Sequence, residues 1–354
     1  MLENESKMIG AVMDEKEAKR RCSPVWPYVH FKPGTPVDPA VVDKLMDGLV
    51  DIHVHGAPAG GWLAGRPTVV HTTMEASKEK VGALVFKDHN TMTNNFSQMI
   101  NESFEIIRKE KEALGEEFTP TKLYGGIVLN YPVGGLNPDA VSTCLGYGDC
   151  VEVWLPSTSA RYQLNKIAEE SGKPNLRGGV YVSENHELLP EMIQILDMIA
   201  DYNNNSEGKR CALAACHVSN EEKFDVLRYI KKKGMDIDVV IDHITQELTI
   251  ATEEECLEMI ELGAYLEFAE TSCVPWTGMQ DWIINFDFSF NLIKSLINKK
   301  GTDHLLLCSD SGQPSHEFVP GWRSFLKTLL AQGVAFDDIK AMSVDVPKKL
   351  TGIK

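Results

Sequence analysis

Eight short apolar segments, separated by amphipathic stretches, constrain the fold of this chain more than any other feature of its sequence. The segments are residues 49–56, 83–90, 123–130, 150–157, 211–219, 238–245, 264–270 and 304–311. Most of their side chains are β-branched or large and apolar, which is typical of strands buried in a parallel sheet. The stretches between them have the periodicity of helices. Eight βα units in succession predict an α/β fold, a single (β/α)8 TIM barrel, with a doubly wound open sheet as the alternative.

The predicted barrel spans residues 49–354 and follows an N-terminal extension of residues 1–48. Within the extension, residues 23–39 contain five prolines, so we expect an irregular or extended arm. Such an arm could pack on a neighbouring subunit of a homo-oligomer or wrap around its own barrel. Residues 178–185 (GGVYVSEN) follow the fourth strand segment and could form an additional strand.

The composition bears on location and partners. The chain has 35 lysines and arginines against 51 aspartates and glutamates, a formal charge of −16, which argues against a nucleic-acid partner. No stretch approaches the ~20 consecutive apolar residues of a membrane helix, and the chain does not begin with a basic segment followed by an apolar run. Eight cysteines without a CxxC pair are too sparse for a disulfide framework. We therefore expect a cytoplasmic protein that acts on a small molecule.

Metal-ligating and ionisable side chains end most of the apolar segments, where the active sites of TIM barrels lie. They are His53 and His55 in the first segment, Lys87, Asp88 and His89 in the second, His217 in the fifth, His243 in the sixth and Asp310 in the eighth. Buried histidines and carboxylates are unfavourable unless they are paired or bind a metal. Imidazole nitrogen and carboxylate oxygen suit Zn²⁺, and also Mn²⁺, Fe²⁺, Ni²⁺ and Co²⁺. The sequence therefore predicts a centre of one or two divalent metal ions, with zinc as the first choice.

The alternation of side chains along a strand refines this expectation. Alternate residues face the same side, so Asp51, His53 and His55 are expected to share one face. Lys87 and His89 are likewise expected to share a face. Asp51 would then support the ligands, for example by orienting an imidazole. Further candidates for supporting the ligands or contacting substrate, all in or near βα loops, are His89, Arg66, Asn130 and Trp154.

Four strings at the ends of the first, fifth, sixth and eighth segments, DIHVHG, CHVS, IDHIT and CSDSGQ, resemble those of the amidohydrolase superfamily. The resemblance covers about residues 49–354. It implies a metal-bearing (β/α)8 barrel whose ligands are His53, His55, His217, His243 and Asp310. The strings VFKDHN, VWLPSTSA and SDSGQP look closer to a less-described branch than to the superfamily's well-known hydrolases.

The fourth segment departs from the superfamily pattern. Two-metal members commonly carry a carboxylated lysine or a glutamate there as the bridging ligand, whereas this segment reads EVWLPSTS. Lys87, at the end of the second segment, is the candidate replacement, because some members take the bridging ligand from that strand. We expect Lys87 to be carboxylated by CO₂ and to bridge two metal ions, since a buried lysine beside cations loses its proton more readily.

The resemblance and the candidate residues together indicate metal-assisted hydrolysis. Water bound to such a metal has its pKa lowered toward about 7. Asp310 would orient that water, accept its proton and return it to the leaving group as general acid. The resemblance implies hydrolysis of a C–N bond in an amide, cyclic amide or related small molecule, with a lactonase or phosphotriesterase-like reaction second. A metal-dependent decarboxylase and a non-catalytic metal-binding barrel are the further alternatives.

Overall fold

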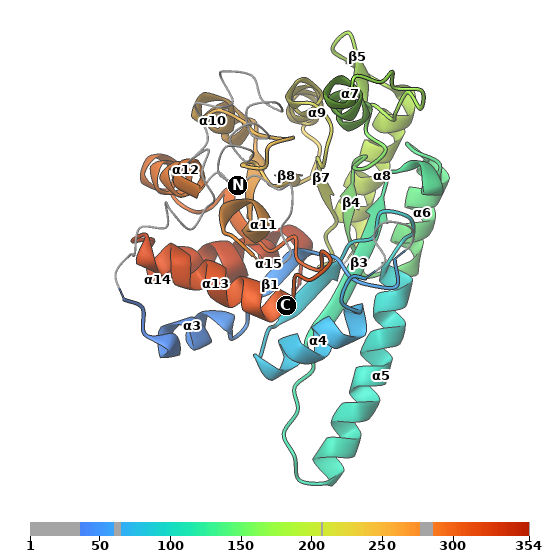
Figure 1. Ribbon diagram of the computed structural model, residues 1–354. Coiled ribbons are helices and arrows are strands. Elements are labelled where there is room, and N and C mark those ends of the chain that lie inside the picture. The colour runs from blue at the N-terminus through green and yellow to red at the C-terminus, as the bar shows by residue number, and fades with distance from the viewer. Residues whose placement is uncertain (1–35, 60–64, 207, 277–285, 354) are drawn as a thin grey trace.

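The computed structural model describes residues 36–59, 65–206, 208–276 and 286–353. Eight parallel strands form one sheet in the order β1-β2-β3-β4-β7-β8-β9-β10 (Figure 1). Their bounds are β1 Val50–Val54, β2 Ala83–Phe86, β3 Lys122–Val128, β4 Cys150–Trp154, β7 Ala212–Ala214, β8 Val239–Ile241, β9 Ala264–Ala269 and β10 Leu305–Cys308. A parallel bridge between Val54 and Ser311 joins the first strand to the segment after the last. The sheet therefore closes on itself, and the predicted (β/α)8 barrel is confirmed.

Helices connect the strands and cover the outside of the barrel (Figure 1). They are α3 Pro39–Met46, α4 Val69–Lys78, α5 Asn94–Ala113, α6 Pro138–Tyr147, α7 Arg161–Ser171, α8 Pro190–Asn205, α9 Asn220–Lys233, α10 Glu253–Glu261, α11 Glu270–Cys273, α12 Phe286–Lys300, α13 Phe318–Ala331, α14 Phe336–Lys340 and α15 Val346–Thr351. A short 3-10 helix, Tyr131–Val133, follows β3, and a π-helical turn, Ala341–Asp345, joins α14 to α15. Across the described ranges, no helix combines the length and the apolar character that crossing a membrane requires.

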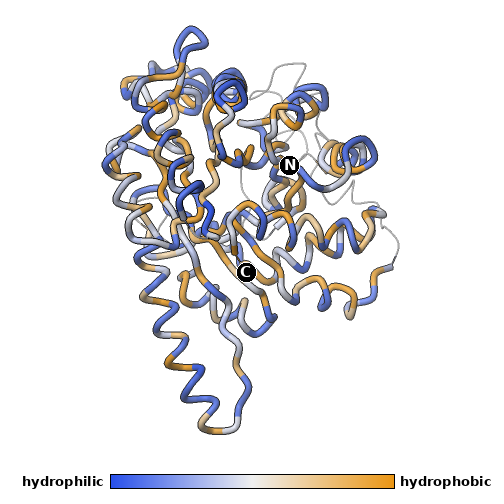
Figure 2. The backbone as a smooth tube through the Cα atoms, turned by 180° about the vertical axis from the view of Figure 1, so that it is seen from behind, coloured by the Kyte–Doolittle hydropathy of each residue, from blue (hydrophilic) through white to orange (hydrophobic). Residues whose placement is uncertain are grey.

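The sheet divides the apolar core into two clusters. Outward-facing strand residues such as Leu84 pack against the helices. The residues that alternate with them, such as Val85, form an interior cluster to which Leu350 of α15 also belongs. Nζ of Lys349, also in α15, lies 5.4 Å from the ring centre of Tyr265 near the start of β9, so α15 closes the end of the barrel at which the strands begin. Figure 2 shows the hydrophobic residues along the central strands, while α5, which extends beyond the barrel, alternates hydrophobic and hydrophilic residues.

A β-bulge in β1 changes which side chains face the barrel interior. Relative to β2, β1 carries one extra residue between Asp51 and Val54. Asp51 consequently faces outward, where Nε1 of Trp322 in α13 donates a hydrogen bond to its carboxylate at 2.7 Å. The side chain of His53 faces inward. The expectation that Asp51 shares a face with His53 and His55 is wrong, because the bulge interrupts the alternation.

Two segments outside the barrel strands were also singled out by the sequence. The strands β5 Ser183–Glu184 and β6 Glu187–Leu188 form a separate antiparallel hairpin, so residues 178–185 add no strand to the barrel. In the N-terminal extension, α3 packs beside α13, where Nη2 of Arg323 lies 2.6 Å from Oδ1 of Asp43. Most of the proline-rich arm, residues 23–35, lies outside the described residues.

Candidate metal centre

The predicted ligands converge at the carboxyl ends of the barrel strands. Asp310, after β10, places Oδ1 3.1 Å from Nε2 of His55 and 3.4 Å from Nε2 of His53. Nε2 of His217, after β7, lies 3.2 Å from Nε2 of His243, after β8. The ring centres of His53 and His243 are 5.7 Å apart, which brings the two groups together. The structure therefore gathers all five residues of the predicted ligand set in one place.

Hydrogen bonds fix the orientation of three of these imidazoles. Nδ1 of His55 donates to a backbone oxygen at the end of β2 at 2.9 Å. Nδ1 of His217 donates to Oε1 of Gln163. Nδ1 of His243 donates to Oγ1 of Thr249 at 3.0 Å, because that hydroxyl itself donates to the backbone oxygen of His243. Each Nδ1 therefore carries the hydrogen, and in the neutral ring the opposite nitrogen, Nε2, has a free lone pair.

Burial keeps these three rings neutral at neutral pH. It lowers the pKa of His55 and His243 well below the usual value and that of His217 to about 3. The lone pairs of His217 and His243 consequently face each other across 3.2 Å, and the lone pair of His55 faces a carboxylate oxygen of Asp310. Two hydrogen-bond acceptor atoms at this distance repel one another when no proton lies between them. The donor set fits a divalent cation, because His53, His55 and Asp310 also offer ligand atoms within 4.8 Å of one another.

Three of the strand ends turn through an uncommon backbone conformation. Cys216, His243 and Asp310 have positive φ angles of 46°, 32° and 51°. Side chains other than glycine rarely adopt this conformation, which is typical of functional sites held in place by the surrounding structure. The backbone N–H of Asp310 donates to the backbone oxygen of His53 at 2.9 Å, so β1 helps to hold the turn after β10.

Asp310 receives hydrogen bonds from two neutral side chains. Oγ1 of Thr271 donates to Oδ2 at 3.2 Å, and Nε2 of Gln313 donates to Oδ1 at 3.2 Å. Burial works to raise the pKa of Asp310, but the electrostatic effect of its neighbours, that of His53 above all, lowers it more, and the pKa lies below the usual value. Asp310 is therefore ionised at neutral pH and can accept a proton.

Lys87 extends from the end of β2 into the same centre. Its Nζ lies 3.1 Å from Nε2 of His53, 3.1 Å from Sγ of Cys216 and 3.4 Å from Oδ1 of Asp242. The side chain is 1% exposed. The predicted replacement for the bridging ligand is thus among the imidazoles, and its carboxylation stays a prediction.

Carboxylates beneath the imidazoles complete the centre, and sequence reasoning missed them. Glu267, inside β9, accepts a hydrogen bond from Nδ1 of His53 at 3.0 Å and another from the backbone N–H of His243 at 3.0 Å. Asp242 accepts the backbone N–H of Cys216 at 2.6 Å. The signal that could have found Glu267 is a lone charged residue in the middle of an apolar strand segment, since a buried charge needs a partner.

Asp51 supports the ligands through the backbone rather than through an imidazole. Its carboxylate accepts the backbone N–H groups of His53 at 2.9 Å and of Ser309 at 3.0 Å. These two bonds tie β1 to β10 next to the centre. The expected role of orienting an imidazole belongs to Glu267, whose carboxylate contacts Nδ1 of His53.

His89 and Asn130 hold the neighbouring loops together. His89 stacks on His55 with ring centres 4.8 Å apart, and its Nδ1 lies 2.9 Å from Oγ of Ser157. Nδ2 of Asn130 donates to the same hydroxyl at 2.8 Å and to the backbone oxygen of His89 at 3.1 Å. Oδ1 of Asn130 accepts the backbone N–H groups of Ser157 and Ser159. These bonds occupy both polar atoms of Asn130, which favours a supporting role over contact with substrate.

Trp154 and Arg66 differ in their position relative to the centre. Trp154 is fully buried within the barrel, and Nζ of Lys87 lies 5.5 Å from the centre of its ring. Arg66 lies in the loop before α4 and is 5% exposed. Its Nη2 donates to Oε1 of Gln313 at 3.0 Å, so it reaches the same glutamine that contacts Asp310.

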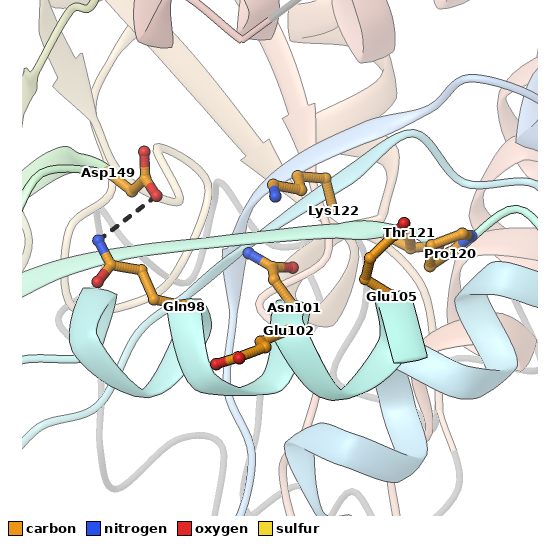
Figure 3. Close-up of a pocket in the computed structure, with 8 residues that line it drawn as sticks. All are labelled: Gln98, Asn101, Glu102, Glu105, Pro120, Thr121, Lys122 and Asp149. Carbon is orange, nitrogen blue, oxygen red and sulfur yellow. Dashed lines mark hydrogen bonds between the residues drawn. The ribbon is translucent and has the colours of Figure 1, made fainter. Parts of the chain in front are cut away.

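A polar hollow on the surface lies away from this centre (Figure 3). It is lined by Gln98, Asn101, Glu102 and Glu105 of α5, by Pro120, Thr121 and Lys122 at the start of β3, and by Asp149 before β4. The beginnings of the strands are at the opposite end of the barrel from Asp310. Asn101 already exchanges two hydrogen bonds with the backbone of Leu123, at 2.7 and 2.9 Å. The hollow therefore takes no part in the candidate centre.

Comparison with known sequences identifies a family. Residues 48–267 match the family described as "Family of unknown function (DUF6282)". No curated protein sequence matches the chain.

Solved structures with the same fold include three hydrolases. A probable 2-pyrone-4,6-dicarboxylic acid hydrolase from Acinetobacter baumannii is 12% identical with a TM-score of 0.50, over 86% of this chain and 98% of that one. A β-aspartyl dipeptidase from Fervidobacterium islandicum AW-1 is 15% identical with a TM-score of 0.51, over 86% and 73%. An organophosphorus hydrolase from Deinococcus radiodurans is 13% identical with a TM-score of 0.51, over 88% and 93%. At these identities the likeness shows the fold alone, and it is the TIM-barrel fold that the amidohydrolase resemblance implies.

Proposed function

The chain belongs to the family DUF6282, and we propose that its barrel is a metal-dependent hydrolase of small molecules. The observation that carries this proposal is the meeting of lone pairs at the carboxyl ends of the strands. Nε2 of His217 faces Nε2 of His243 at 3.2 Å, and Nε2 of His55 faces Oδ1 of Asp310 at 3.1 Å. A divalent cation would convert these repulsions into bonds.

Five side chains would hold the metal: His53, His55, His217, His243 and Asp310. A divalent cation bound there supplies water with a pKa lowered toward about 7 and a positive charge for the oxygen of the substrate. Asp310 would accept the proton of the attacking water and return it to the leaving group. Thr271 and Gln313 hold the Asp310 carboxylate by one hydrogen bond to each oxygen, which fixes the direction from which it takes that proton.

We propose that the bond hydrolysed is a C–N bond of an amide, cyclic amide or related compound. An amine leaves only as it gains a proton, and Asp310 would carry the proton taken from water to that nitrogen. Lactone or phosphoester hydrolysis is the second candidate. The names of the structural neighbours favour keeping it, because they include a 2-pyrone-4,6-dicarboxylic acid hydrolase and an organophosphorus hydrolase beside a dipeptidase.

We also propose two zinc ions, with carboxylated Lys87 as the bridging ligand. The neutral amine of Lys87 would add CO₂, forming one N–C bond and a carbamate and releasing one proton. The location of Nζ, 3.1 Å from Nε2 of His53 and 3.1 Å from Sγ of Cys216 beside His217, supports a ligand shared between the two groups of imidazoles.

Removal and return of metal test the proposed hydrolysis. The chain is stripped with a chelator, reloaded with Zn²⁺, Mn²⁺, Fe²⁺, Ni²⁺ or Co²⁺, and assayed on amides, cyclic amides, lactones, phosphoesters and carboxylic acids. We expect the reloaded protein, and not the stripped one, to hydrolyse an amide or cyclic amide.

The other outcomes of this assay distinguish the alternative reactions from one another. Turnover of lactones or phosphoesters alone would support the second candidate, and release of CO₂ from a carboxylic acid would support a decarboxylase. A chain that takes up no metal, or whose activity survives chelation, contradicts the proposal.

A further inference from the structure

Arg66 brings a buried positive charge to the candidate centre that the proposed hydrolysis does not use. The residue is 5% exposed, and burial lowers the pKa of its guanidinium to about 10, so it stays charged at neutral pH. Nη2 donates to Oε1 of Gln313 at 3.0 Å. A guanidinium has five N–H donors, so this bond uses a minority of them.

The other donors of Arg66 have no acceptor in the part of the chain that the structure describes. Both Nε and Nη1 are buried and make no hydrogen bond there. A buried charged group without its hydrogen bonds is unfavourable by several kcal/mol, by order of magnitude. Such an arrangement indicates a binding site for an anion, which would supply the missing acceptors.

The two carboxylates that act on the charge of Arg66, those of Asp310 and Asp88, accept no hydrogen bond from it among the described residues. Asp88 and Asp310 both act on its charge, which raises the pKa of Arg66 against the effect of burial. Oδ1 of Asp88 accepts the backbone N–H groups of Asn90 and Thr91, and Oδ2 of Asp88 has no hydrogen-bond partner among the described residues. The structure therefore leaves Nε and Nη1 open to a further acceptor although a carboxylate lies in the same neighbourhood.

Gln313 links this open guanidinium to the residue proposed for proton transfer. Its Oε1 accepts from Arg66, and its Nε2 donates to Oδ1 and to the backbone oxygen of Asp310, each at 3.2 Å. One amide side chain thus spans the distance between the two groups. A ligand group held by Arg66 would therefore lie within the length of one side chain from Asp310.

We propose that Arg66 binds a carboxylate of the substrate, so the hydrolysed compound is an organic acid with its carboxylate close to the scissile bond. This inference rests on the proposed hydrolytic function and names its substrate class. A guanidinium matches a carboxylate by two parallel N–H···O bonds. A carboxylate fits better than a phosphate dianion, because Asp88 and Asp310 oppose a second negative charge in the same place.

Calorimetry on the full chain loaded with zinc tests this assignment. The probes are levulinate, a keto acid without a hydrolysable bond, and its homologues longer by one and two methylenes. Each is compared with the neutral keto alcohol in which a hydroxymethyl group replaces the carboxylate. We expect at least one acid to bind tenfold or more tightly than its alcohol, and Arg66→Gln to abolish that preference. Arg66→Lys should retain part of it, since a lysine keeps the charge without the planar pair of donors.

The control is Arg108→Gln, which removes an arginine from the surface of α5 and should leave the preference unchanged. Circular dichroism establishes that each variant folds, and Arg66→Lys alone decides the outcome if Arg66→Gln does not fold. The inference is overturned if no acid is preferred over its alcohol, if the preference survives in folded Arg66→Gln, or if it is undiminished in Arg66→Lys. Arg66-dependent binding of inorganic phosphate without a preference for the acids also overturns it.

Zinc content, measured first, separates the two proposals. Absence of metal contradicts the proposed hydrolase, whereas a zinc-loaded chain without the preference for acids contradicts only the role of Arg66.

Discussion

Nζ of Lys87 lies 3.1 Å from Nε2 of His53, at the carboxyl ends of the neighbouring strands β2 and β1. Burial works to lower the pKa of Lys87, but Cys216, Asp242 and Asp310 raise it above the usual value. In the metal-free protein the charged ammonium group of Lys87 therefore lies among imidazoles and carboxylates, where a metal ion could also bind. A bound metal ion and the ammonium form of Lys87 would compete for these same carboxylates.

Carboxylation of Lys87 should accordingly depend on metal. We expect reconstitution with zinc in bicarbonate buffer to add the mass of one CO₂ to the chain, as measured by native mass spectrometry. Reconstitution in CO₂-free buffer should add none and should bind less metal. Lys87→Arg is the matched variant, because it keeps a positive charge and cannot form the carbamate. Two bound zinc ions in a chain with unmodified Lys87 would show that the bridging ligand lies elsewhere.

Asp310 and His53 should separate catalysis from metal binding. Asp310→Asn keeps an oxygen ligand and loses the proton acceptor, so turnover should fall by about 10²–10⁴-fold with most of the metal retained. His53→Ala should lose metal and activity together. Metal analysis and initial rates on the same samples distinguish the two effects. Equal activity of Asp310→Asn and the unaltered chain would exclude Asp310 as the general base.

Glu267 should act on the metal through His53. Its carboxylate holds Nδ1 of that imidazole at 3.0 Å, and an amide in its place would carry no charge. We expect Glu267→Gln to weaken zinc binding by about 10–100-fold, measured by competition with a coloured chelator. Glu258→Gln, on the exposed side of α10, is the control and should have no effect. An unchanged zinc affinity in Glu267→Gln would show that the carboxylate serves folding alone.

Lys223 should make the stability of the protein depend on alkaline pH. It is 1% exposed in α9, and burial lowers its pKa from 10.5 to about 8. The unfolded chain therefore binds more protons than the folded one between pH 8 and 10.5, and the free energy of unfolding rises with pH across that window.

Lys223→Met removes this pH dependence. At pH 7 the variant should be more stable by up to about 3 kcal/mol, less the loss of the hydrogen bond from Nζ to Oδ1 of Asn220. The difference from the unaltered chain should shrink as the pH approaches 10. Urea unfolding at several pH values measures it, and Lys232→Met, exposed on the same helix, should show no such trend.

The sequence predicted the strands and the meeting of the ligands because both depend on local patterns. Apolar segments of the right length mark buried strands, and parallel strands bring their carboxyl ends to one side of the barrel. The direction of the Asp51 side chain could not be predicted. A bulge of one residue in β1 interrupts the alternation of side chains, and the position of that bulge depends on how β1 pairs with β2. A pattern that treats every strand as regular has no means of placing that extra residue.

Contacts between distant residues account for the rest. Glu267 and His53 are 214 positions apart in the chain, so neither the segment AYLEFAE nor the segment DIHVH identifies the other as its partner. Arg66 shows the same limitation in a loop. Its residue type fits a solvated surface equally well, and only the path of the loop before α4 reveals that its guanidinium is buried beside Gln313.

The position of α15 has a consequence for how the protein is made. Leu350 of α15 belongs to the interior cluster of the barrel, yet it follows all eight strands in the chain. During synthesis on the ribosome, every strand is therefore complete before the helix that closes their starting end has emerged. Until α15 emerges, the interior side chains of the nascent barrel lack that cover, which leaves an apolar surface exposed to chaperones.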